Sequence, residues 1–173
     1  MNIGIRNQKK KMIKGVKVKK LKIFQDKPDL KQKVKPGIFM EVLRKSDRLC
    51  SSFAQTNFTI AYPGTIKAFH WHKKQDDLWF VASGQAVIVL YDQRKNSPTH
   101  NQLEVIKIKE GDYKLILIPA GVVHGYKVLG RKPCLLFYHV TREYNRRNPD
   151  EQRIDPYDRK INFNWQTLKR NKQ

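Results

Sequence analysis

Acidic residues are scarce in this sequence of 173 residues, in which 15 Asp and Glu stand against 36 Lys and Arg. The formal net charge is +21, and thirteen of the basic side chains lie within residues 1–35. Such an excess favours an anionic partner, which means nucleic acid, an anionic surface or a phosphorylated substrate. Solvated surface lysine explains the charge equally well, since lysine dominates and no zinc-finger or RNA-recognition motif is present. Nucleic-acid binding is therefore open but not favoured.

Cysteine is also rare, and long apolar runs are missing. Cys50 and Cys134 are the only cysteines. They are too few for a disulfide framework, and we expect two buried thiols in a reducing compartment. No apolar run approaches the length of a membrane span, and the basic N-terminus lacks the apolar stretch of a signal peptide. The sequence therefore predicts a cytoplasmic protein without a membrane span.

Short apolar runs separated by turn residues fill the middle of the chain. The length and the hydrophobic fraction of 39% predict one domain with a real core. The regular spacing of the runs indicates an all-β barrel or sandwich. Strands are predicted at residues 16–23, 38–43, 58–62, 67–72, 77–82, 85–91, 103–109, 113–118, 124–128 and 133–140.

The two ends of the chain differ from this middle. Residues 1–13 predict a flexible basic leader, residues 14–165 a single domain and residues 166–173 a C-terminal tail. After Thr141 the composition turns polar. This change predicts a short covering extension with one short helix and Trp165 as its anchor.

The most informative residues are two histidines one position apart, His70 and His72. Residues i and i+2 of a strand point to the same face of a sheet, so the two imidazoles are expected to share a surface. A third histidine, His124, belongs to a later predicted strand. Together the three predict an imidazole-lined pocket inside an all-β domain.

The pattern H-x-H-x4-D-x6-G that begins at His70, followed by P-x-G-x2-H that ends at His124, resembles the two signature motifs of the cupin superfamily. Cupins are small double-sheet jelly rolls. In many of them these histidines and the acid bind a divalent metal, and such a donor set suits a first-row transition metal. The resemblance therefore offers a metal-dependent enzyme as an alternative, with the ligands His70, His72, Asp77 and His124. We expect instead that these four donors do not all converge and that the protein needs no cofactor.

A wider match, from about Val16 to Trp165, resembles the dTDP-4-dehydrorhamnose 3,5-epimerase family of cupin-fold enzymes. Each landmark is weak alone, but their order and spacing are specific for the fold family. The landmarks are Gly37-x-Phe39-x-Glu41, Gln55-x-Asn57, Lys67-Ala-Phe-His70, Tyr91-Asp92-x-Arg94-x-x-Ser97-Pro98-Thr99, Ile118-Pro119-x-Gly121-x-x-His124-Gly125-Tyr126, Tyr138-x5-Tyr144-Asn145 and Asn164-Trp165. The resemblance implies a cupin-type double-sheet jelly roll. It also implies an epimerase or isomerase of a nucleotide-diphosphate 4-keto-6-deoxy sugar, in deoxysugar or surface-polysaccharide synthesis.

The chemistry implied by the resemblance needs a base on one face of the sugar and an acid on the other, because the protons beside a keto group are acidic. The resemblance places the base on His70 and the proton donor on Tyr138, and it gives His124 a mainly structural role. Lys67 stands where the family has an arginine near the enolate or the diphosphate. A homodimer is also implied, in which one subunit reaches the pocket of the other. The implied substrate-binding residues are Lys67, Gln55, Asn57, Glu41 and Tyr144.

The sequence departs from the family pattern at the partner of the base. Asp77 stands where the family has an active-site lysine, and no acidic residue follows Trp165, where the family has the aspartate that orients the histidine. Losing an orienting carboxylate mis-sets the imidazole tautomer and slows catalysis. Asp150, Asp155 and Asp158 are candidates to replace it. The departure leaves open a further alternative, a non-catalytic module that binds a nucleotide sugar or a polyanion.

Overall fold

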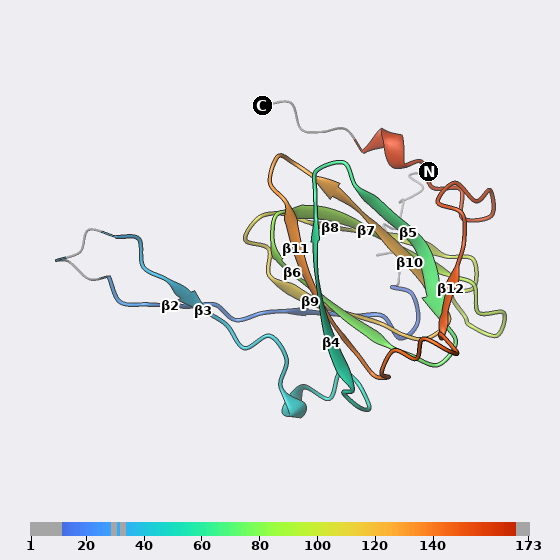
Figure 1. Cartoon of the computed structure of the whole chain (residues 1–173), viewed down its shortest axis with the longest axis horizontal. Coiled ribbons are helices and arrows are strands. Elements are labelled where there is room, and N and C mark those ends of the chain that lie inside the picture. Colours follow the sequence, from blue (N-terminus) through green and yellow to red (C-terminus); the bar gives the residue numbers. More distant parts are fainter. Residues whose placement is uncertain (1–11, 29–30, 32–33, 169–173) are drawn as a thin grey trace, which may run out of the picture.

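Two five-stranded antiparallel sheets face each other in the computed structural model, which describes residues 12–28, 31 and 34–168 (Figure 1). The first sheet has the order β1 (Lys17–Lys20), β9 (Lys114–Ile118), β6 (Asp77–Ser83), β11 (Cys134–Val140) and β4 (Gln55–Ala61). The second has the order β12 (Glu151–Arg153), β5 (Ile66–His72), β10 (Val122–Leu129), β7 (Gln85–Asp92) and β8 (Leu103–Ile108). A separate arm consists of β2 (Phe24–Gln25) and β3 (Ile38–Phe39), and the short 3-10 helices are η1 (Lys45–Asp47) and η2 (Trp165–Thr167). The predicted all-β, double-sheet jelly roll is confirmed.

The core lies between the sheets because apolar side chains alternate along each strand and meet those of the facing sheet. β7 shows this pattern clearly. Ala86, Ile88 and Leu90 pack between the sheets, whereas Val87 and Val89 pack on the outer face. Because β7 is buried on both sides, its run is almost continuously apolar. Because β7 is packed on both faces and pairs with β10 along its whole length, it fixes the position of β10, which carries His124.

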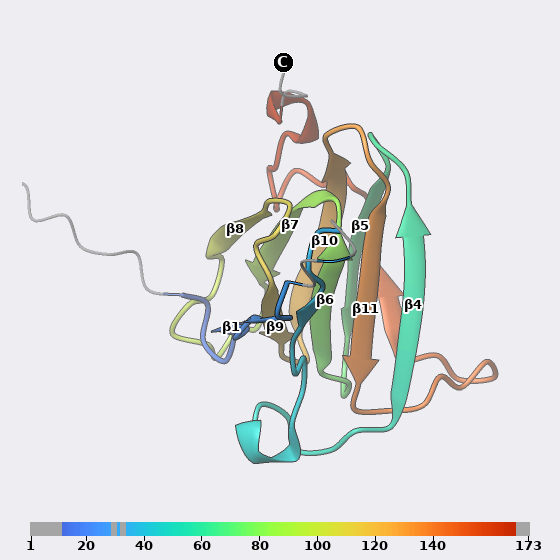
Figure 2. The same cartoon turned by 90° about the vertical axis from the view of Figure 1, so that its left-hand side faces the viewer.

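Segments from both ends of the chain cover the outer faces of the sheets. Ile161 and Trp165 pack with Phe69 on the outer face of the second sheet. Leu21 packs with Leu78 on the outer face of the first. β4 has no such cover and forms the free edge of its sheet beside β11 (Figure 2). The terminal segments therefore cover part of both outer faces and leave the edge at β4 uncovered.

The loop after β7 is held by a buried carboxylate. Asp92 accepts hydrogen bonds from the Arg94 guanidinium and from the hydroxyls of Ser97 and Thr99, at 2.6–2.9 Å. Burial alone would raise the pKa of Asp92, but these hydrogen bonds outweigh it and hold the pKa well below its usual value. Arg94 also donates to the Lys14 carbonyl at 2.6 Å. The landmark around Asp92 is therefore structural, and it ties the N-terminal segment to the sandwich.

The strands predicted between residues 58 and 140 agree with β4 to β11 to within a few residues. The predictions for the two ends of the chain agree less well with the structure. The predicted strand at 38–43 shrinks to β3, and β12 forms within the segment predicted to be a polar extension. Residues 1–11 of the predicted leader lie outside the described residues. Ile13 is buried in the core, and its backbone N–H donates to Glu104 at 3.0 Å, so this residue packs with the sandwich.

Three smaller predictions can be compared with the structure. Trp165 is fully buried and anchors the C-terminal segment as predicted. Cys134 is a buried free thiol, whereas Cys50, also free, is only half-buried. Among the described residues, no helix combines the length and the hydrophobicity that crossing a membrane requires.

Candidate functional site

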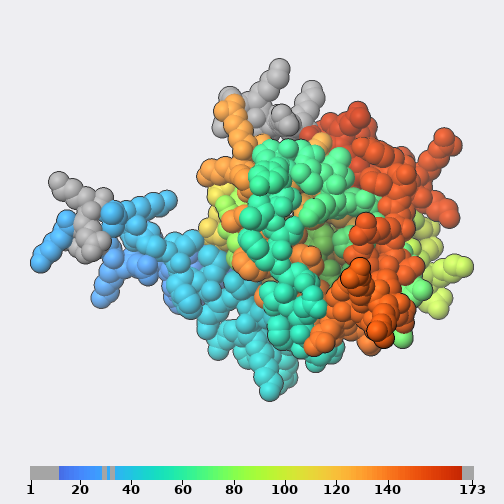
Figure 3. All heavy atoms as spheres, in the orientation of Figure 1, coloured from blue at the N-terminus to red at the C-terminus, as the bar shows by residue number. Residues whose placement is uncertain are grey.

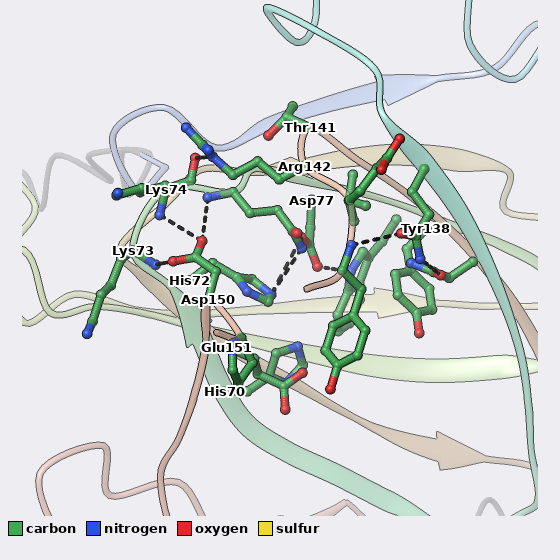
Figure 4. A pocket seen from close by; sticks show the side chains of 18 of the residues that line it. His70, His72, Lys73, Lys74, Asp77, Tyr138, Thr141, Arg142, Asp150 and Glu151 are labelled. Carbon is green, nitrogen blue, oxygen red and sulfur yellow. Dashed lines mark hydrogen bonds and ion pairs between the residues drawn. The ribbon is translucent and has the colours of Figure 1, made fainter. Parts of the chain in front are cut away.

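A pocket of about 1670 Å³ lies between the inner faces of the two sheets. Side chains from β4, β5, β6, β10 and β11 line it, and the segment after β11 forms its mouth (Figure 4). That segment and β4 both lie on the face of the molecule that the space-filling view shows (Figure 3). The pocket therefore joins both sheets, and side chains from either one can act on a bound molecule.

Strand periodicity explains why polar side chains point into this pocket. On β5, His70 and His72 point inward while Trp71 packs on the outer face, as the spacing of i and i+2 predicts. On β6, in the facing sheet, Asp77 and Trp79 point inward. One sheet thus supplies imidazoles and the other a carboxylate.

The pairing of β5 with β10 adds the third histidine. His124 lies opposite His70, and the register then shifts by one residue before Lys67. This extra residue on β5 lets Lys67 and His70 both line the pocket although they are three positions apart. Gly125 permits the close approach of the strands, because a Cβ there would collide with Ala68.

The histidine cluster, defined as His70, His72, Asp77 and His124, gathers donors from three strands. One donor atom of each residue lies within 4.8 Å of the others. Oδ1 of Asp77 is 3.6 Å from His72 Nε2, and Oδ2 is 3.6 Å from His124 Nε2. The ring centres of His70 and His124 are 4.1 Å apart. The four side chains gather in one place because β5 and β10 pair side by side and β6 supplies the carboxylate from the facing sheet.

His70 and Tyr138 line the same pocket from opposite sheets, as their proposed roles require. Burial, and next the neighbouring His124, lower the pKa of His70. Burial raises the pKa of Tyr138, and the carboxylates of Asp77 and Glu151 raise it further. At neutral pH His70 is therefore an unprotonated imidazole that can accept a proton, and Tyr138 is a phenol that can donate one.

The carboxylates predicted as replacement partners of the base have other contacts. Asp150 accepts backbone hydrogen bonds from residues 73–75 at 2.9–3.2 Å. Asp155 and Asp158 accept backbone N–H groups of their own turns. Asp77 is instead the carboxylate of the histidine cluster. Burial alone would raise its pKa, but the neighbouring imidazoles outweigh burial and keep the pKa below its usual value.

Four of the predicted substrate-binding residues line the pocket, namely Gln55, Asn57, Lys67 and Tyr144. The Gln55 amide donates to Asn57 Oδ1 at 2.5 Å and accepts from the Tyr144 backbone N–H at 2.9 Å. Lys67 Nζ donates to the Thr59 hydroxyl at 2.9 Å. These contacts hold a polar wall of amides and a hydroxyl along β4, which could bind the hydroxyls of a sugar.

Glu41 is the predicted substrate-binding residue that the structure leaves outside the pocket. Its exposed carboxylate pairs with Arg44 at 3.1 Å. The prediction rested on a motif position, but the chain around Glu41 runs from the arm along the outer face of the first sheet. Glu41 therefore does not reach the site of its own chain.

Sequence reasoning missed further side chains that line the pocket, among them Trp79, Tyr126, Glu151 and Arg153. A signal for Trp79 was present, because it follows Asp77 by two positions on one strand. Its indole N–H donates to Asp77 Oδ2 at 3.1 Å. Glu151 and Arg153 belong to β12, which is short and polar and therefore carries no apolar alternation to reveal it.

The chain resembles known proteins over most of its length. Residues 10–173 match the family model described as dTDP-4-dehydrorhamnose 3,5-epimerase. The chain is 46% identical over 156 residues to the spore coat polysaccharide biosynthesis protein SpsL of Bacillus subtilis (strain 168), with 90% of this chain and 98% of that protein covered.

Solved structures show the same fold. A dTDP sugar isomerase of Desulfovibrio desulfuricans G20 has a TM-score of 0.78 at 24% identity, over 91% of this chain and 95% of that one. The dTDP-6-deoxy-D-glucose-3,5-epimerase RmlC of Legionella pneumophila Philadelphia 1, solved in complex with dTDP-4-keto-L-rhamnose, has a TM-score of 0.74 at 25% identity. That match covers 90% of this chain and 80% of the other.

Proposed function

The chain belongs to the dTDP-4-dehydrorhamnose 3,5-epimerase family, and on this premise we propose that it is a sugar-nucleotide epimerase of polysaccharide biosynthesis. Its substrate is a nucleotide-diphosphate-linked 4-keto-6-deoxy sugar. The observation that carries the proposal is one pocket with an unprotonated imidazole, His70, on one sheet and a protonated phenol, Tyr138, on the other.

The proposed reaction is a proton transfer through an enolate. The keto group at C4 makes the hydrogens on C3 and C5 acidic, and His70 removes one of them while the electron pair moves onto the carbonyl oxygen. Tyr138 then gives its proton to the same carbon from the opposite face, which inverts the configuration. His70 is left as an imidazolium and Tyr138 as a phenolate, and exchange with solvent restores both.

The nucleotide diphosphate binds at the mouth of the pocket in this proposal. Attraction of a diphosphate to basic groups acts over about 10 Å at 0.1 M salt. No described lysine before residue 36 lines the pocket, so the charge at the mouth is distinct from that of the N-terminal segment. The basic side chains that line the pocket are Lys67, Lys73, Lys74, Arg142 and Arg153.

Deuterium incorporation tests the epimerase proposal. Chelator-treated protein is incubated with dTDP-4-keto-6-deoxyglucose in D2O, and the sugar is analysed by NMR. We expect deuterium at C3, C5 or both, together with a product of inverted configuration, because each inversion takes its new proton from a group that exchanges with solvent. A sugar nucleotide that binds but gains no deuterium would contradict the proposal.

A non-catalytic nucleotide-sugar module is the second candidate. In the described part of the chain, His70 makes no hydrogen bond to a carboxylate, and this favours weak or absent turnover. The same experiment separates the two candidates, because the module would bind the dTDP sugar in a titration and leave its C–H bonds unexchanged.

We also propose that the active form is a homodimer in the cytoplasm. The arm exposes apolar side chains at Phe24, Ile38 and Phe39, and Phe58 is exposed on the open edge strand β4. Apolar surface gathered in this way is typical of protein interfaces. A dimer through the arm would also give Glu41 a role, at the pocket of the partner subunit. The two free thiols support the reducing compartment.

The Phe39→Asp variant tests the dimer. Phe39 is 60% exposed and its ring lies beside that of Phe24 in the arm, with ring centres 6.1 Å apart, so a charge there should disrupt the interface without unfolding the sandwich. Light scattering after size exclusion should give twice the chain mass for the natural sequence and the chain mass for the variant. The matched control is Tyr157→Asp, at a similarly exposed aromatic far from the arm, and it should remain dimeric. A natural protein that is monomeric would contradict the proposal.

A further inference from the structure

A second cavity of about 550 Å³, here called the outer cavity, lies on the faces of β4 and β11 that point away from the first pocket. Thr56 of β4 and His139 of β11 are register partners and line the outer cavity. Their neighbours Gln55 and Tyr138 line the first pocket, as strand alternation requires. Residues 43–53 complete the outer cavity. Its volume lies within the range of about 300–1,000 Å³ that is typical of ligand sites.

The lining of the outer cavity is positively charged. It includes Arg44, Lys45 and Arg48, and no carboxylate of the described residues belongs to it. Arg44 is paired with Glu41 at 3.1 Å. Lys45 and Arg48 form no ion pair within the part of the chain that the structure describes. Two cationic groups therefore remain available to an anionic ligand.

The backbone around η1 places these two cationic groups. Asp47 accepts the Arg44 backbone N–H at 2.8 Å and the Lys19 ammonium at 2.6 Å, so its charge is engaged outside the cavity. Arg48 has a φ of 49°, in the left-handed region that residues other than glycine rarely adopt. Its N–H donates to the Lys45 carbonyl at 3.3 Å. The resulting turn lets both side chains line one cavity, and such unusual backbone is frequent at ligand sites.

Aromatic and hydroxyl side chains form much of the remaining lining. Phe53 is 60% exposed, and its ring centre lies 6.1 Å from that of His139. Burial lowers the pKa of His139, so its ring is uncharged at neutral pH. Exposed flat rings beside cationic groups suit a nucleotide, because bases stack on aromatic rings while the phosphates pair with the cations. The hydroxyl side chains of the lining are Ser51, Ser52 and Thr56.

We propose that the outer cavity binds a nucleoside diphosphate at a site separate from the first pocket. Lys45 and Arg48 bind the diphosphate, since ammonium and guanidinium groups form charge-assisted hydrogen bonds with phosphate oxygens. Phe53 stacks with the base. The ligand lies against the outer faces of the strands whose inner faces carry Gln55 and Tyr138. This site goes beyond the epimerase proposal and does not rest on it, because its occupation is measured without turnover.

A thiol within the outer cavity reports its occupation. Cys50 lines the cavity as a half-buried free thiol, and Cys134, the other cysteine of the chain, is fully buried and serves as an internal control. The full-length chain is treated with N-ethylmaleimide, and mass spectrometry follows the alkylation of each cysteine. With dTDP at about ten times its dissociation constant, Cys50 should react about tenfold more slowly, because only the free fraction reacts. Pyrophosphate or thymidine alone should protect Cys50 less at the same concentration.

The double variant Lys45→Gln/Arg48→Asn tests the two cationic groups. It removes both charges, and asparagine tolerates the left-handed backbone at position 48. Protection of Cys50 should then need at least about tenfold more dTDP. Two controls should protect like the natural chain, namely Arg159→Asn, at an exposed turn outside both cavities, and Lys67→Gln, inside the first pocket. Equilibrium dialysis should show one dTDP fewer per chain in the double variant than in the natural chain.

Three results would overturn the outer site. The first is dTDP that, at millimolar concentration, neither slows alkylation of Cys50 nor binds less to the double variant. The second is protection that rises with protein concentration without nucleotide, which would assign the cavity to an interface between copies. The third is pyrophosphate that protects as well as dTDP, which would exclude a role for the base. If Cys50 of the natural chain does not react at all, the dialysis comparison decides.

Discussion

Replacing His70 by glutamine should lower the rate of deuterium incorporation into the keto sugar by about 10²–10⁴-fold, the usual contribution of a positioned base. Glutamine keeps a polar side chain of similar reach but has no basic nitrogen. His70 points into the pocket, and burial and then His124 lower its pKa, so the natural residue is unprotonated at neutral pH. The diphosphate is expected to bind at the mouth, away from His70. The loss should therefore appear in kcat, measured by NMR on chelator-treated protein.

The control for this variant makes the same chemical change at His100, which is exposed in a turn. His100→Gln should exchange deuterium at the natural rate. Circular dichroism and thermal melting confirm that both variants fold. If folded His70→Gln exchanged deuterium as fast as the natural chain, another residue would have to be the base. If it lost affinity for the sugar nucleotide while kcat held, His70 would be a binding residue.

The placement of single side chains within a strand followed from the sequence. Alternation is a property of the strand backbone, so His70 and His72 could be assigned to one face of β5 before any tertiary contact was known. The same rule would have placed Trp79 beside Asp77. Alternation alone did not bring these residues to His124, because their approach depends on the register between β5 and β10 and on the packing of β6 across the core. Alternation within one strand carries no information on either.

The ends of the chain were predicted less well for a related reason. Ile13 looked like part of a polar leader, but it is buried by strands that are distant in sequence. β12 is polar and only three residues long, and it forms because it pairs with β5. Glu41 had the right motif but lies on a segment that leaves the pocket. In each case tertiary contacts decide the structure, and local propensity is a weak guide.

Of the tertiary contacts made by the C-terminal segment, those of Trp165 are expected to contribute most to the free energy of unfolding. It is fully buried, with ring centres 5.2 Å from Phe69 and 4.7 Å from Phe163. Its indole N–H donates to the Pro156 carbonyl at 2.9 Å. Phe69 immediately precedes His70 on β5, so Trp165 supports from outside the strand that carries the proposed base inside.

Trp165→Ala should lower the free energy of unfolding by about 3–5 kcal/mol, as expected when a large buried aromatic side chain is removed. Urea denaturation measures this loss as a lower midpoint with an unchanged slope. The matched control is Tyr157→Ala, at an aromatic in the same segment that is 63% exposed, and it should change stability by less than about 0.5 kcal/mol. A loss below about 1 kcal/mol for Trp165→Ala would mean that residues 154–168 do not pack on the sheet in solution. Because Trp165 does not line the pocket, the folded fraction of the variant should still exchange deuterium, and any fall in activity should follow the unfolded fraction.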